Sequence, residues 1–94
     1  MVRTSAVNRG DTALFTAMSR GDRDALGMLY DRHAKTLFAL AMHVAQDRTR
    51  AEDLLHDTFL DLALHAREPG ATCPPVLRWL VQRLFARGAA AVTP

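Results

Sequence analysis

The sequence lacks the features that mark several large classes of protein. It has a single cysteine, Cys73, so no internal disulfide can form and the fold must depend on packing, as is usual in a reducing compartment. No apolar run approaches the roughly 20 residues of a membrane helix, and the N-terminus has no apolar segment of the kind found in signal peptides. We therefore expect a soluble, cytoplasmic protein without membrane insertion.

Residues with the spacing of a metal centre or a catalytic site are also missing. The four histidines and Cys73 form no Cys-x-x-Cys or His-x-x-x-His pair. There is no glycine-rich phosphate loop, and an acid/base pair such as Asp53 with Asp57 would need a cleft that a small helical protein scarcely provides. The sequence therefore predicts a binding module with no metal, no cofactor and no enzymatic activity. The histidines are His33, His43, His56 and His65.

What the sequence does have is helical periodicity over most of its length. Hydrophobic residues make up 49% of the 94 residues, which is enough for a packed core. Apolar residues recur at three- and four-residue steps, and no strand pattern or internal repeat is present. The periodic stretches are residues 11–20, 22–45, 49–66 and 76–88. We predict an all-α bundle of three to four helices over residues 11–88, after a polar tail at 1–10 and before a tail or linker at 89–94.

The apolar stripes of these stretches define the expected core. Its members are Leu14, Phe15, Met18, Leu26, Leu29, Tyr30, Leu37, Leu40, Ala41, Val44, Ala51, Leu55, Phe59, Leu62, Ala66, Val76, Leu77, Leu80, Val81, Leu84 and Phe85.

Capping residues indicate where the helices begin and end. Asp11 is expected to cap the first helix and Gly21 to end it. Thr49 begins a Thr-x-x-Glu capping box, Pro75 fits the first turn of the last helix, and Gly88 is expected to end that helix.

The outer surface of the second long helix is unusual. Opposite its apolar side the helical period places Asp53, Asp57 and Asp61 at four-residue steps, interleaved with Leu60 and Leu64. Carboxylates at this spacing repel one another and weaken a helix. One interpretation is a solvated face with incidental leucines. The other interpretation, which we favour, is a surface that docks on a basic partner helix. The acids would supply charge complementarity and the leucines would supply buried apolar area.

Charge is distributed unevenly along the chain. The net charge of the whole chain is +2. Residues 11–68 carry seven basic and ten acidic residues, whereas residues 69–94 carry three arginines and no acid. Solubility alone is one explanation of such an imbalance. The other is a basic partner for the middle of the chain and an anionic partner for its C-terminal part.

Two stretches of the sequence resemble region 2 of extracytoplasmic-function sigma factors. They are Gly21 to Ala25 leading into Leu29 to His33, and Asp47 to Leu60, where the family reads close to "DRAEAEDLVQETFL". The resemblance covers roughly residues 12–66 and implies that the second long helix binds the coiled-coil clamp helices of the RNA polymerase β′ subunit. Carried over to this sequence, it places Asp53, His56 and Asp57 at that contact. It also implies that His33 is a partly buried structural residue.

The last predicted helix is similar to the family's promoter-reading helix through Arg78 to Val81, and the match then degrades. Where the family commonly continues with asparagine, aspartate and further arginines, residues 86–91 read Ala-Arg-Gly-Ala-Ala-Ala. Trp79, Arg83 and Arg87 lie away from the centre of the apolar stripe, and an indole beside guanidinium groups can hold an unstacked base. These three are our candidates for contact with the non-template single strand of the −10 promoter element. The alternative is that Trp79 packs against another helix or the preceding loop.

The residues and the resemblance together predict a sigma factor region that acts in transcription initiation, with an anti-sigma factor as a further candidate partner. The chain stops at Pro94 without the helix-turn-helix domain that such factors carry after this region. It is therefore either an excised domain or a protein of one sigma-like region. A rival interpretation is a regulatory protein or decoy that binds polymerase or an anti-sigma factor without reading promoter DNA. A third is a helical domain that self-associates through Leu60 and Leu64.

Overall fold

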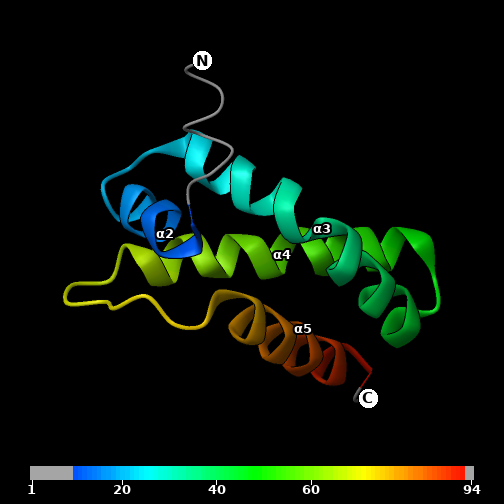
Figure 1. Ribbon diagram of the computed structural model, residues 1–94. Coiled ribbons are helices and arrows are strands. Elements are labelled where there is room, and N and C mark those ends of the chain that lie inside the picture. Colours follow the sequence, from blue (N-terminus) through cyan, green and yellow to red (C-terminus); the bar gives the residue numbers. More distant parts are fainter. Residues whose placement is uncertain (1–9, 93–94) are drawn as a thin grey trace.

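Residues 10–92 form four helices and no strand in the computed structural model, which describes this part of the chain (Figure 1). The helices are α2 (Asp11–Ser19), α3 (Arg23–Ala45), α4 (Arg48–Ala66) and α5 (Val76–Val92). The predicted all-α bundle is therefore confirmed. Most of the tail predicted at residues 1–10, and the end of the one predicted at 89–94, lie outside the described residues. None of the four helices is long and apolar enough to cross a membrane.

Gly21 ends α2, as the sequence predicted, in a left-handed turn. Its φ is +90°, a conformation that glycine adopts without steric cost. The N–H of Gly21 donates to the carbonyl of Met18 at 2.9 Å, and the N–H of the next residue donates to that of Ala17 at 3.0 Å. These two bonds form the Schellman arrangement. Asp22 then caps α3, because its carboxylate accepts from the backbone N–H of Asp24 at 2.9 Å.

Asp11 does not cap α2, contrary to the prediction. It is the first residue of the helix, behind an N-cap at Gly10 that makes no side-chain hydrogen bond. Its carboxylate instead joins α2 to α3, since Oδ1 accepts from Nη1 of Arg32 at 2.7 Å and Oδ2 lies 3.0 Å from Nε2 of His33. The side chain of His33 is only 12% exposed. His33 is thus partly buried, as expected, and helps to hold α2 on the bundle.

A two-residue connection, Gln46 and Asp47, joins α3 to α4. The predicted capping box at Thr49 is wrong, because Asp47 caps α4 instead. Gln46 closes α3 in the left-handed conformation, with φ of 55°. Asp47 follows in an extended conformation and caps α4, accepting from the backbone N–H of Arg50 at 2.9 Å. Because an N-cap carboxylate bonds to the N–H two or three residues later, the helix begins at Arg48. Thr49 therefore lies inside the first turn.

The limits of α5 also differ from the prediction. Pro75 lies just before the helix, where its carbonyl accepts from the N–H of Trp79 at 2.9 Å. Gly88 does not end the helix, which continues to Val92. Gly88 is buried, and a Cβ at this position would lie 2.4 Å from Cγ1 of Val44. The residue is a glycine because α5 approaches α3 closely here.

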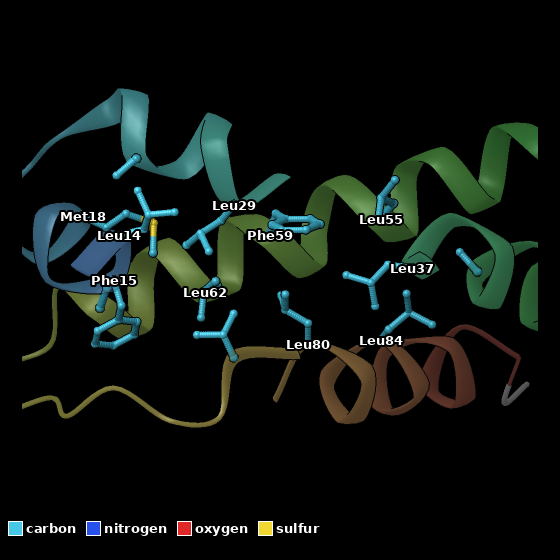
Figure 2. Close-up of a cluster of buried hydrophobic side chains, with 14 of the residues drawn as sticks. Leu14, Phe15, Met18, Leu29, Leu37, Leu55, Phe59, Leu62, Leu80 and Leu84 are labelled. Atoms are coloured by element: carbon cyan, nitrogen blue, oxygen red, sulfur yellow. The ribbon is translucent and has the colours of Figure 1, made fainter. Parts of the chain in front are cut away.

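α4 is the centre of the bundle. In Figure 1, α2 and the first part of α3 lie on one side of α4 and α5 lies on the other, and α3 crosses α4 so that its end packs on α5. Apolar side chains from all four helices meet along it (Figure 2). The side of α4 that periodicity assigned to the core is buried along the whole helix. Its residues are Ala51, Leu55, Phe59, Leu62 and Ala66.

Three residues that we expected in the core are exposed instead. Tyr30 is 36% exposed, Leu77 40% and Phe85 43%. In α5, Leu80 and Leu84 occupy the centre of the apolar stripe and are fully buried. The stripe of α5 is thus wider than the surface available on α3 and α4, and residues at its edge remain in contact with water.

Candidate docking face and the ion pairs between α4 and α5

The outward side of α4 carries acidic and apolar side chains in a strip, which we call the outer strip. It consists of Asp53, His56, Asp57, Leu60 and Leu64. Asp53 and His56 are exposed, and the side chain of Asp57 is half exposed. Leu60 is 42% exposed and Leu64 67%, the largest value for any large hydrophobic residue in the described part of the chain. Two leucines one turn apart therefore face water, in the turns that follow Asp53 and Asp57.

Asp61 does not belong to this strip, although the sequence placed it there. Its side chain is only 13% exposed and faces α5. Its two oxygens accept from Arg87, with Nε at 2.5 Å from Oδ2 and Nη2 at 2.8 Å from Oδ1. These hydrogen bonds hold the pKa of the Asp61 carboxyl below its usual value, against the opposing effect of burial. The expectation that Asp61 is available to a partner is wrong for the free domain.

The two arginines predicted to contact DNA converge on this carboxylate. Nη1 of Arg83 lies 3.7 Å from Oδ2 of Asp61. Arg87, besides its bidentate pair, has Nη1 at 3.9 Å from Oδ2 of Asp57 in the outer strip. The side chains of Arg83 and Arg87 are still 46% and 40% exposed. The structure therefore brings Arg83 and Arg87 together, but with acidic partners from α4.

Trp79 completes this group, which we call the α5 cluster: Trp79, Arg83 and Arg87. The guanidinium carbon of Arg83 lies 4.8 Å from the centroid of the Trp79 ring, a distance typical of a cation–π contact. The indole also stacks on His65 of α4, with ring centroids 5.4 Å apart and planes at 19°. Trp79 is partly buried and packs against the core. This agrees with the alternative in which the residue packs against another helix.

A hollow of about 350 Å³ lies where the ends of α3 and α5 meet the first half of α4. Val44 and Leu54 supply apolar wall, and Gly88 lines the hollow where α5 comes close to α3. The charged residues around it are Arg50, Asp53, Asp57 and Arg87. Opposite charges thus balance at its rim. Among residues 10–92, no three His, Cys, Asp or Glu side chains are grouped so that they could hold a metal ion.

Sequence reasoning missed the link between Asp61 and Arg87. The two residues are 26 positions apart and lie on different helices. The three- and four-residue spacings that relate side chains within one helix therefore give no sign of this pair. It also missed the role of Gly88, although an isolated glycine within an apolar helical pattern is a known sign of close packing.

The curated proteins that this chain resembles include two sigma factors of mycobacteria. The chain is 30% identical over 69 residues to the ECF RNA polymerase sigma factor SigK of Mycobacterium ulcerans, a match that covers 73% of this chain and 37% of the relative. It is 31% identical over 80 residues to the ECF RNA polymerase sigma factor SigL of Mycobacterium tuberculosis, covering 85% and 39%. The chain thus spans less than two fifths of the length of either relative. No protein-family model and no solved structure matches it.

Proposed function

Because this chain carries a domain of the extracytoplasmic-function sigma factor family, we propose that it docks on the clamp helices of the RNA polymerase β′ subunit through the outer strip of α4. Such a protein acts in the cytoplasm, in transcription initiation. Sigma factors are not enzymes, which agrees with the binding module that the sequence predicted.

The exposure of Leu60 and Leu64 carries this proposal. Leucines that are 42% and 67% exposed keep apolar area in contact with water, and covering it stabilises a complex. The carboxylates of Asp53 and Asp57 beside them would attract a basic partner helix and fix its register. His56 is exposed next to these groups, and a neutral imidazole can donate one hydrogen bond and accept another. Charge and apolar area thus favour a basic amphipathic helix as partner.

The test is binding of this chain to a purified β′ clamp-helix fragment, comparing Asp53→Lys with Asp31→Lys. Asp31 is an exposed acid on α3, outside the outer strip, and its replacement changes the net charge by the same amount. We expect Asp53→Lys to weaken binding at least about tenfold, because it places a cation against a basic partner. Asp31→Lys should leave the affinity within about twofold.

Equal effects of the two lysine variants would contradict docking through the outer strip. Circular dichroism checks that both variants keep their helices. Sedimentation addresses self-association. A concentration-dependent dimer that disappears when Leu60 and Leu64 are replaced by serine would assign the outer strip to a second copy of the chain.

The second part of the proposal concerns the α5 cluster. We propose that Trp79, Arg83 and Arg87 contact the non-template single strand of the −10 promoter element. The cation close to an indole supports this assignment, since bases stack on aromatic rings and arginines pair with phosphates. The exposure of both arginine side chains leaves them accessible to a strand that approaches α5.

The ion pairs of α5 favour a second candidate function. Both arginines have acidic partners within the domain, and the helix continues after Arg87 with small apolar residues rather than further cations. A protein of this kind could occupy polymerase, or bind an anti-sigma factor, without reading promoter DNA. Single-stranded DNA with a −10 sequence separates the two candidates, because only the first predicts that it binds more tightly than a scrambled strand.

A further inference from the structure

Asp61 presents to α5 the geometry that a phosphate would present. Both of its oxygens accept from Arg87, at 2.5 and 2.8 Å, and Arg83 approaches one of them to 3.7 Å. Arginine forms this parallel, two-bond contact with carboxylates and with phosphates alike. The anion-binding capacity of the two arginines is therefore directed inward, toward a residue of the same chain.

We propose that Asp61 occupies the anion site of the α5 cluster in the free domain and competes there with a backbone phosphate of single-stranded nucleic acid. The inference rests on the DNA part of the proposed function and is independent of docking through the outer strip. It assigns to Asp61 the role of setting how tightly the domain binds nucleic acid. In this role Asp61 is a positioning residue that acts through the two arginines.

The surroundings of the ion pair allow such an exchange without unfolding. The side chains of Arg83 and Arg87 are 46% and 40% exposed, so their guanidinium groups can turn toward solvent while α5 stays packed. Leu80 and Leu84, on the buried side of the same helix, hold α5 in place. The stacking contact between Trp79 and His65 involves neither arginine, so the exchange does not require it to change. Only the arginine side chains need to move.

Asp57 should contribute less than Asp61 to this competition. Its nearest contact with Arg87 is 3.9 Å long, and its side chain is half exposed. Water screens an exposed pair at this distance. The structure therefore predicts a graded effect, with Asp61 first, Asp57 second and an acid remote from α5 last.

The experiment is a fluorescence-anisotropy titration of a labelled single-stranded oligonucleotide with the −10 sequence, at several stated salt concentrations. The variants are Asp61→Asn, Asp57→Asn and, as the charge-matched control, Asp31→Asn. We expect affinity to rise about tenfold, about threefold and less than twofold, respectively. The salt dependence of Asp61→Asn should also become steeper, by about 0.7 in the logarithmic slope for each additional phosphate contact.

Two outcomes overturn the proposal. One is that Asp61→Asn binds no more tightly than wild type, and the other is that it gains no more than Asp31→Asn, which would mean a general charge effect. Because Asp61→Asn could loosen α5, tryptophan fluorescence checks the packing of Trp79. If the packing of Trp79 is lost in Asp61→Asn, the test is the comparison of Asp57→Asn with Asp31→Asn. A gain in affinity for Asp57→Asn no larger than that for Asp31→Asn then overturns the proposal. In an Arg87→Gln background the gain from Asp61→Asn should largely disappear. Binding to the clamp-helix fragment is measured without DNA, so its failure is a separate result.

Discussion

Two acids of α4 that lie eight residues apart have opposite surroundings. Asp53, in the outer strip, is exposed to solvent, whereas Asp61 is 13% exposed and bonded to Arg87. The acids follow one another at four-residue steps. Because an α-helix turns about 100° per residue, each step rotates the side chain by about 40°, and two steps carry it from the outward side of α4 toward α5. A row that looks uniform in the sequence is therefore divided between a solvent-exposed face and a contact within the domain.

The comparison teaches that a charge pattern predicts a surface only when the neighbouring helices are known. In the outer strip, Asp53, Leu60 and Leu64 are exposed to solvent. Asp61, beside this strip, pairs instead with Arg87 of α5. Three matched pairs of variants compare contacts inside the domain with exposed positions, beginning with the largest expected effect.

Leu62 and Leu64 form the most direct test, because they are two residues apart on α4. Leu62 is fully buried and Leu64 is 67% exposed. Leu62→Ala should lower the free energy of unfolding by about 2–5 kcal/mol through lost burial and a cavity. Leu64→Ala should change it by less than about 0.5 kcal/mol. Urea unfolding followed by circular dichroism measures both, and similar losses would mean that Leu64 lies in the core.

Gly88 and Gly27 test how closely α5 is held to α3. A Cβ at Gly88 would lie 2.4 Å from Cγ1 of Val44, whereas a Cβ at Gly27 would meet nothing within 4 Å. Gly88→Ala should therefore lower the free energy of unfolding by about 1–2 kcal/mol through overpacking. Gly27→Ala should raise it by about 0.5–1 kcal/mol, because alanine favours the helix.

The same unfolding measurement provides a check on the cause. Combining Gly88→Ala with Val44→Ala removes the clashing methyl group, so the double variant should be more stable than the sum of the single losses predicts. Strict additivity would contradict a contact between these two positions.

The smallest expected effect concerns the ion pair at Asp61. Asp61→Asn should lower the free energy of unfolding at neutral pH by about 1 kcal/mol, because it removes the charge from a partly buried pair. Asp53→Asn should change it by less than about 0.5 kcal/mol, since Asp53 is exposed. Thermal unfolding of both variants beside wild type gives the comparison.

The effect of Asp61 should also depend on pH in a defined direction. Its pKa in the folded domain is lowered from the usual 3.8, chiefly by the hydrogen bonds from Arg87. A carboxyl with a lowered folded pKa stabilises the domain above its unfolded pKa, and this stability is lost as the pH falls through the folded value. The difference between wild type and Asp61→Asn should thus be constant above about pH 5 and shrink below about pH 4. A difference that does not change with pH would exclude the ion pair as its source.

Several parts of the fold could be predicted because their cause is local. Gly21 ends α2 because glycine adopts its left-handed conformation without steric cost, and the loop between α4 and α5 follows from its prolines and glycine. The predicted caps at Asp11 and Thr49 were wrong for a different reason. At the start of α4, Asp47 precedes Thr49 and caps the helix in its place. Asp11 instead forms an ion pair with Arg32 of α3. A side chain that can cap a helix bonds elsewhere when the tertiary structure offers a charged partner.

The sequence by itself determined the helical class, the buried side of α4 and the acids and leucines of its outer strip, because the helical period relates residues close together in the chain. Only the tertiary structure decided that Asp61 pairs with Arg87, that Trp79 stacks on His65, and that Gly88 packs against Val44. Each of these contacts joins residues of different helices. Their distances depend on how the helices pack, which no local period specifies.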